Sequence, residues 1–192
     1  MESKPTSIRF KQSAFSSLRQ PLLTDLKSES FAVLLGKREI VGNQEIITVV
    51  EALYPSEEDY QSRSLTHLNI DNDFIRNCLM EVKERFDIDT IIDVHTHPFC
   101  SKNVSFSGTD DKDEKTFSSW VFNNFDDIYY GSIVFSQTDY SARMWSFDKD
   151  ESISKKALIK TQTQIEYWPS ADVDNSDFSE ILKNTDEKQG FL

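Results

Sequence analysis

Short apolar runs, several of them rich in β-branched residues, recur along the chain between polar segments. Runs of this kind, bounded by Gly, Pro, Asn or Asp, indicate buried strands. They predict strands over residues 7–11, 31–35, 45–53, 65–70, 90–94, 132–135 and 142–147, the last two as a hairpin. Residues 41–44 supply the turn between the second and third strands. Residues 153–168 fit either a strand or a strand joined to a helix, and the pattern does not choose between them.

Three segments are predicted as helices: residues 13–26, which Pro21 interrupts, residues 74–86 and residues 107–125. Asp71-Asn72-Asp73 supplies candidate N-caps for the second helix. The apolar positions of that helix share one face, with Ile75, Leu79, Val82 and Phe86 on it. The polar stretches 56–64 and 99–106 indicate exposed loops.

This order of elements predicts an α+β domain with a mixed β-sheet flanked by helices. The chain has 192 residues, of which 38% are hydrophobic, so a core of ordinary size needs no disulfide or metal to support it. We expect a single domain over residues 1–168. Acidic, Ser and Asn residues dominate from Pro169 onward, which indicates an acidic tail or linker over residues 169–192.

The overall charge is strongly negative, with 21 basic and 33 acidic residues and a formal net charge of −12. A field of that sign repels phosphate backbones and anionic lipids, so we expect no nucleic-acid partner and no membrane partner. The two cysteines, Cys78 and Cys100, form no CxxC pair, and no apolar run approaches the roughly 18 residues of a membrane span. These features favour a cytoplasmic protein.

Two of the three histidines lie in the segment Asp93-Val94-His95-Thr96-His97-Pro98. Residues i and i+2 of a strand point to the same side, so His95 and His97 present neighbouring imidazoles. That arrangement suits two nitrogen ligands of one zinc ion, and Pro98 ends the strand beside the second histidine. Two half-exposed histidines without a metal are the alternative interpretation. Asp93 shares this face, either as an orienting partner of an imidazole or as a half-exposed carboxylate.

A third ligand is expected from the acidic segment that follows, residues 107–114. Ser107-x-x-Asp110 has the spacing of a capping box, with Asp in place of Glu, and early carboxylates suit a helix N-terminus. Helix capping alone therefore explains these residues. It is compatible with a ligand role, because a capped turn would hold Asp110 opposite the histidine strand. Asp111 is the next candidate if the register differs by one.

His95-Thr96-His97-Pro98 followed by Ser107-x-x-Asp110 resembles the signature of the JAMM (MPN+/JAB) zinc metalloproteases. In that family a distant Glu precedes an apolar strand that ends in Gly. The segment Glu29-Ser30-Phe31-Ala32-Val33-Leu34-Leu35-Gly36 has the same length and ending, so Glu29 is the matching residue. Glu45 and Glu51 are its competitors, and both lie inside a different predicted strand.

The resemblance covers roughly residues 7–148 and is to bacterial members encoded beside ubiquitin-like conjugation machinery. It implies a single MPN/JAB domain of the cytidine-deaminase-like fold. Two departures stand out. Twelve residues separate His97 from Asp110, two more than in the common eukaryotic pattern. Ala32 replaces the usual Gly, which would tighten the space beside the metal. Neither departure removes a ligand.

The resemblance also implies a function. Zn²⁺ would be bound by His95, His97 and Asp110, Glu29 would act as general base toward a water molecule, and Ser107 would donate a hydrogen bond to the tetrahedral oxyanion. The enzyme would be an isopeptidase or peptidase that cuts a ubiquitin-like modifier from its target or trims the C-terminus of the modifier. A ThiF-like adenylyltransferase and a conjugating enzyme of the same system are candidate partners.

Family members of this kind hold the extended tail of the substrate by strand addition, and residues 56–64 and 99–106 occupy the positions of substrate-contacting inserts. A metal-free MPN scaffold that acts as a protein-interaction module is the main alternative. A DNA-repair role, as in the distantly similar RadC group, is a third hypothesis, which the negative charge disfavours.

Overall fold

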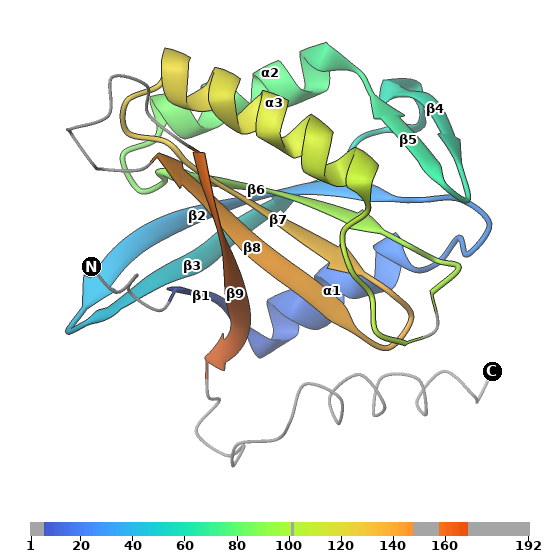
Figure 1. The fold of residues 1–192 in the computed structure, drawn as a ribbon, viewed down its shortest axis with the longest axis horizontal. Helices are drawn as coiled ribbons and strands as arrows, with labels where there is room; N and C mark the ends of the chain where they lie inside the picture. The colour runs from blue at the N-terminus through green and yellow to red at the C-terminus, as the bar shows by residue number, and fades with distance from the viewer. Residues whose placement is uncertain (1–5, 101, 148–157, 169–192) are drawn as a thin grey trace.

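A closed β-barrel of seven strands forms the centre of the computed structural model, which describes residues 6–100, 102–147 and 158–168 (Figure 1). The strand order is β1-β3-β2-β6-β7-β8-β9, and β9 pairs with β1. The strands are β1 (Thr6–Lys11), β2 (Phe31–Val41), β3 (Gln44–Leu53), β6 (Thr90–Thr96), β7 (Tyr129–Phe135), β8 (Tyr140–Phe147) and β9 (Leu158–Trp168). The pairs β1–β3, β1–β9 and β6–β7 are parallel and the others antiparallel, so the sheet is mixed, as predicted.

Helices α2 (Asn72–Glu84) and α3 (Gly108–Asn124) cover one face of the sheet, and α1 (Gln12–Leu22) lies on the other (Figure 1). Strands β4 (Tyr60–Ser64) and β5 (His67–Ile70) follow the 3-10 turn Glu57–Asp59 and form a separate two-stranded sheet. Within the described residues, no helix is long and apolar enough to cross a membrane.

The barrel interior is filled by apolar side chains that alternate along the strands. All seven barrel strands contribute, and α1 adds Phe15, Leu18 and Leu22 to the same cluster. The Phe15 ring packs edge-on against Phe10 and Phe135, with centroids 5.2 and 5.7 Å apart. Helix α1 is therefore part of the barrel core rather than a surface element.

A second apolar cluster lies between the outer face of the sheet and helices α2 and α3. Leu79 and Val82 of α2 and Val121 of α3 are buried there together with Val33 and Ile91 of the sheet. The N-terminus of α2 is capped as predicted, because the Asp71 side chain accepts a hydrogen bond from the backbone of Asp73. This layer holds the two helices across β2, β6 and β7.

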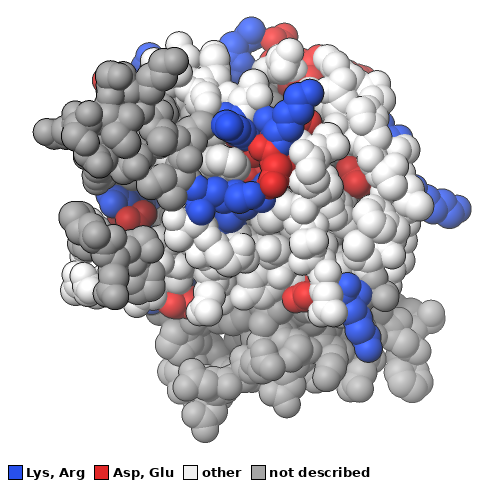
Figure 2. Space-filling view, in the orientation of Figure 1, with Lys and Arg blue, Asp and Glu red and all other residues white. Residues whose placement is uncertain are grey.

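The surface that faces the viewer in Figure 1 carries no large area of one charge. Most of it is uncharged, and several Lys and Arg side chains lie next to Asp and Glu (Figure 2). Asp111 of α3 accepts from Arg143 of β8 at 2.5 Å and from Lys160 of β9 at 2.8 Å. Ion pairs of this kind offset part of the negative charge.

Most predicted elements are present, and the turn at Gly42 has the positive φ of 61° that glycine allows. Residues 158–168 form a strand, which decides that alternative for the described part. Helix α1 ends at Leu22 rather than at residue 26, and β2 continues to Val41. The tail predicted over residues 169–192 lies outside the described residues, and closure of the sheet was not predicted.

Two predictions were wrong. Residues 56–64 were expected as an exposed loop, yet they contain a 3-10 turn and β4. Strand β4 is mostly polar and partly exposed, so it carries no apolar run that the sequence pattern could reveal, whereas β5 falls within the strand predicted over residues 65–70. Phe86 was placed on the apolar face of the second helix, but α2 ends at Glu84 and the Phe86 side chain is 96% exposed.

Candidate metal centre

Strand β6 divides its side chains between the two sides of the sheet. Ile92 and Val94 belong to the barrel interior, whereas Asp93 and His95 line a groove on the side of α2 and α3. His97 follows the last residue of the strand and lines the same groove. Strand β6 pairs with β2 on one side and with β7 on the other, so backbone hydrogen bonds on both sides fix the position of the segment that carries the imidazoles.

The carboxylate of the cluster comes from the first turn of α3. Ser107 is the N-cap, and its Oγ accepts a hydrogen bond from the Asp110 amide at 3.2 Å. In return, the Ser107 amide donates to Asp110 Oδ2 at 2.5 Å. The predicted capping box therefore forms, with Asp in the position of Glu, and it fixes the direction of the Asp110 side chain.

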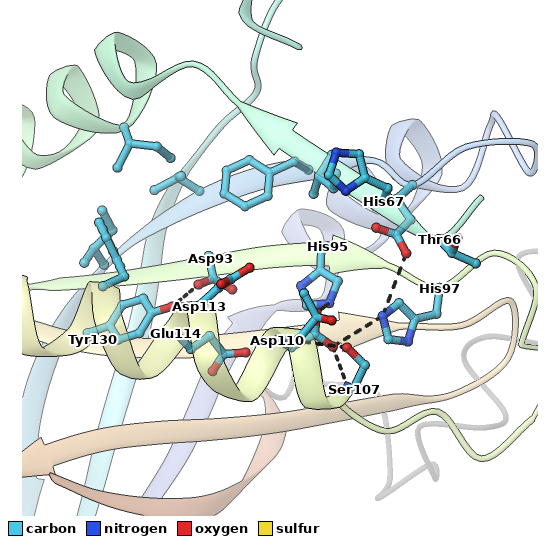
Figure 3. Close-up of a pocket in the computed structure, with 18 of the residues that line it drawn as sticks. Thr66, His67, Asp93, His95, His97, Ser107, Asp110, Asp113, Glu114 and Tyr130 are labelled. Atoms are coloured by element: carbon cyan, nitrogen blue, oxygen red, sulfur yellow. Dashed lines mark hydrogen bonds and ion pairs between the residues drawn. The ribbon is translucent and has the colours of Figure 1, made fainter. Parts of the chain in front are cut away.

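The Asp110 carboxylate lies between the two imidazoles (Figure 3). Its Oδ1 is 3.5 Å from His95 Nε2, and its Oδ2 is 3.5 Å from His97 Nε2. One ligand atom from each residue lies within 4.8 Å of the others, and the side chains are only 10, 7 and 18% exposed for His95, His97 and Asp110. The structure thus brings together the three residues that the sequence nominated as ligands.

This donor set fits a zinc ion. Nε2 of His95 is buried and has no hydrogen-bond partner within the described residues, which leaves its lone pair or proton unsatisfied. Two ligands of a tetrahedral zinc, each at about 2.0–2.1 Å, lie about 3.3–3.4 Å apart. The two 3.5 Å separations, each to a different oxygen of Asp110, are close to that spacing. Three protein ligands leave the fourth position to water or substrate, as in catalytic sites.

Glu29 reaches the cluster from the segment that precedes β2. Its amide donates to the Ser64 carbonyl at 2.8 Å, and the next amide, that of Ser30, donates to Thr96 Oγ1 at 2.9 Å. These bonds join the segment to β4 and to the end of β6. They place Glu29 Oε1 at 4.0 Å from His97 Nε2.

The four groups change one another's pKa. Burial raises the pKa of Glu29 to about 7, with Asp110 adding to the effect and His95 opposing it. Burial and then the neighbouring His95 lower the pKa of His97. Burial opposes charging of both His95 and Asp110, but their mutual attraction outweighs it, so the pKa of His95 is raised and that of Asp110 is lowered. A neutral His97 and an ionised Asp110 are the forms that bind a metal.

Comparison with known families agrees with this geometry. The family model for prokaryotic homologs of the JAB domain matches residues 11–147, a range that contains all the candidate residues. The chain belongs to this family. The resemblance seen in the sequence is thereby confirmed, and the closed mixed sheet with its helices is the form that a JAB domain takes in this chain. No curated protein matches the chain.

A groove of about 580 Å³ extends from the cluster of candidate ligands in this JAB domain. Residues of β5, α2 and α3 line it together with residues of β2, β6 and β7. Its apolar lining includes Phe31, Val33, Leu68, Ile75, Ile91 and Phe117. Asp93, Asp113, Glu114 and Tyr130 lie along the groove on the side of His95 that is away from His97 (Figure 3).

Asp93 is half-buried in this groove, and its Oδ2 accepts a hydrogen bond from the Tyr130 hydroxyl. Burial raises the pKa of Asp93 to about 7, and the charge of Glu114 adds to the shift. Within the described residues Asp93 makes no hydrogen bond to either imidazole. The geometry therefore gives no support to an orienting role toward an imidazole and agrees with the alternative of a half-exposed carboxylate, here bonded to Tyr130.

The competing carboxylates lie elsewhere in the JAB domain. Glu45 forms an ion pair with Arg38 at 2.9 Å, and Glu51 forms one with Arg85 at 2.6 Å. Ala32 belongs to the cluster in the barrel interior, together with its pairing partner Val94. The expectation that Ala32 tightens the space beside the metal was wrong, because β2 directs it to the opposite side of the sheet.

Sequence reasoning missed Arg143, which organises the N-terminal half of α3. Its buried guanidinium donates to both oxygens of Glu114 at 2.7 and 2.6 Å and to Asp111 at 2.5 Å. It also lies 3.6 Å from the centroid of the Phe106 ring. Asp111 is therefore engaged outside the ligand cluster. A basic residue inside the apolar run 142–145 was the signal that could have found it.

Proposed function

We propose that this JAB domain is a zinc-dependent isopeptidase or peptidase that releases a ubiquitin-like modifier from a target or trims the C-terminus of the modifier. The convergence of Asp110 with His95 and His97, next to Glu29, carries this proposal. Zn²⁺ held by those three ligands would lower the pKa of a coordinated water toward about 7 and polarise the substrate carbonyl. The residues around it supply the rest of the chemistry.

Glu29 is the proton carrier in this proposal. Its side chain is 9% exposed and its pKa of about 7 lies near physiological pH, so it can both accept and release a proton there. It takes the proton of the attacking water and delivers it to the leaving amine. Loss of such a group typically lowers the rate by about 10²–10⁴.

Ser107 stabilises the oxyanion in this proposal. Its Oγ accepts the Asp110 amide, and its own O–H is left to donate to the substrate. The capping interaction holds the Oγ beside the ligand Asp110, at the exposed entrance of the site. Loss of one oxyanion donor typically costs about 10²–10³ in rate.

The tail of the modifier would enter as an extended chain along β5. Among the described strands β5 pairs only with β4, and its Leu68 and the neighbouring Thr66 and His67 line the groove. The free edge of β5 can accept a further strand through backbone hydrogen bonds, which is the mode called strand addition. A ThiF-like adenylyltransferase and a conjugating enzyme of the same modification system remain proposed partners.

Hydrolysis of defined fusions tests the proposal. The zinc-loaded protein is incubated with a panel in which ubiquitin-like proteins are joined to a target through a peptide or an isopeptide bond. We expect wild type to release the modifier and Glu29→Gln and His97→Ala to lose at least about 10² in rate. Asp126→Asn, which removes a negative charge from an exposed turn, serves as the control. Wild-type protein that carries zinc and cleaves no fusion contradicts the proposal.

Elemental analysis separates the enzyme from the metal-free interaction module. Near-stoichiometric zinc in the purified wild type, lost in His97→Ala, favours the enzyme. Protein that binds a modifier tightly yet retains no zinc after incubation with the metal favours the module.

A further inference from the structure

The groove beyond the ligand cluster is lined by acidic and apolar residues. Its described lining contains no Lys and no Arg. The acidic members are Glu29, Asp93, Asp110, Asp113 and Glu114. Asp110 belongs to the candidate ligand cluster and Glu29 lies beside it, while Arg143 donates to both oxygens of Glu114 and Trp145 donates to its Oε2. Asp93 and Asp113 are left as negative groups that no cation of the described chain neutralises at ion-pair distance.

Of Asp93 and Asp113, Asp93 says more about a ligand, because it is half-buried and Asp113 is exposed. The Tyr130 hydroxyl donates to its Oδ2, and no hydrogen bond from a described residue reaches its Oδ1. Glu114 on α3 has the same sign and disfavours the charge of Asp93, while His95 and Arg143 act in the opposite direction without an ion pair to it. A carboxylate that is partly removed from water without a cationic partner is costly for the protein, and a ligand that brings the cation removes that cost.

The walls of the groove suit a long basic side chain. Phe31, Ile75 and Phe117 supply apolar surface in the groove that Asp93 also lines. Arg and Lys pack their aliphatic stems on apolar surface and extend only the charged end, so both parts of such a side chain find a matching environment here.

The distance between Asp93 and His95 along β6 limits the position that the basic residue can have in the substrate. Asp93 is two residues from His95 on the strand, which corresponds to about 6.6–6.8 Å. An extended chain that follows the groove covers the same distance in two residues. The basic residue therefore lies two or three positions before the bond that is cut at the metal centre.

We propose that the groove selects a substrate tail with an Arg or Lys at the second or third residue before the cleaved bond, and that Asp93 recognises this residue. Asp113, exposed on the rim, adds to the attraction. This inference rests on the proposed peptidase function, to which it adds the chemistry of the substrate tail. The net charge of −12 acts in the same direction at longer range.

Peptide binding tests this selection without any need for hydrolysis. Fluorescein-labelled hexapeptides of Ala and Gly with a free C-terminal carboxylate carry Arg, citrulline or Glu at each of the last four positions in turn. Citrulline has the shape of Arg without its charge. Binding to the zinc-loaded Glu29→Gln protein is measured by fluorescence anisotropy. We expect Arg at one of the two predicted positions to bind at least about tenfold more tightly than citrulline.

Further substitutions in the Glu29→Gln protein show which residue causes the preference for Arg over citrulline. Asp93→Asn should bring the Arg-to-citrulline ratio close to one, and Asp113→Asn should lower it in part. Asp126→Asn, with the same loss of charge outside the groove lining, should leave the ratio unchanged. Zinc content and thermal unfolding are measured for each variant. If Asp93→Asn does not fold, the Arg-to-citrulline ratios of the parent protein and of Asp113→Asn still test the inference.

Equal binding of the Arg and citrulline peptides at every position overturns the inference, as does an unchanged ratio in folded Asp93→Asn. The hydrolysis of fusions tests the proposed peptidase function independently of peptide binding. Protein that cleaves fusions with either residue at equal rates keeps the peptidase function and loses this inference. Protein that prefers the Arg peptides but cleaves no fusion keeps the inference and loses the peptidase function.

Discussion

Arg143 of β8 and Glu114 of α3 are joined by two hydrogen bonds of 2.7 and 2.6 Å, although their side chains are only 4 and 6% exposed. The Trp145 indole donates to the same carboxylate at 2.8 Å. Glu114 lies one helical turn after Asp110, so this buried pair secures the part of α3 that carries the candidate ligand. It links the barrel to the candidate metal centre.

Arg143→Ala should destabilise the domain by about 3–5 kcal/mol, because it leaves the Glu114 carboxylate buried without its cation. Urea unfolding followed by fluorescence measures this free energy. Arg85→Ala is the matched control, since Arg85 also binds carboxylates, those of Asp87 and Glu51, but at the exposed surface. The control should lose about 1 kcal/mol or less. Equal losses of unfolding free energy in Arg143→Ala and Arg85→Ala would contradict a stabilising role of the buried pair.

Zinc should stabilise the folded protein through the cluster of His95, His97 and Asp110. At a free zinc concentration of about 100 times the Kd the gain is about 2.7 kcal/mol, which raises the Tm by roughly 5–10 °C for a chain of this length. His95→Ala and Asp110→Asn should lose this gain in thermal unfolding with and without zinc. His67→Ala should keep it, because His67 lines the groove and bonds to Ser62. A His67→Ala variant that loses the same gain would argue against the assigned ligands.

Glu29→Gln should stabilise the metal-free protein at about pH 8 and have little effect near pH 5. Burial raises the folded-state pKa of Glu29 from 4.5 to about 7, so the folded protein holds this proton more tightly than the unfolded chain does. Folding stability therefore falls as the pH rises from about 4.5 to 7, and the cost is fully present above that range. Removing the ionisable group removes the cost, which is on the order of 1–3 kcal/mol.

The measurement is the Tm of wild type and Glu29→Gln across this pH range after chelation of metals. The difference in Tm should grow with pH. A difference that is the same at both ends of the range would show that Glu29 keeps an ordinary pKa in the folded protein.

Cys78 should resist alkylation in the native protein. Burial in the layer under α2 raises the pKa of its thiol to about 12, so little thiolate forms near pH 8. Cys100, in the half-exposed loop after His97, is the internal control. Mass spectrometry after brief iodoacetamide treatment should find one modified cysteine in native protein and two after unfolding. Modification of Cys78 at the rate of Cys100 would contradict its burial.

Local patterns predicted much of this fold. The strand that carries His95 and ends just before His97, and the helix capped by Ser107, follow from periodicity and capping, which act over a few residues. Phe86 was misplaced because α2 ends at Glu84 with Arg85 as its C-cap, and no Gly or Pro stands there to mark the end of the helix in the sequence. Strand β4 was missed because its residues are mostly polar, whereas its partner β5 was predicted.

The sequence by itself determined the residue types of the candidate site, their order and the faces on which they stand, because alternation in a strand and the geometry of a helix N-terminus are local properties. Only the tertiary structure decided that the sheet closes, that Glu29 rather than Glu45 or Glu51 reaches the histidines, and that Asp93 lies in the groove without a cation. These relations depend on contacts between residues far apart in the chain. Such contacts form when apolar layers pack, and no short-range pattern encodes them.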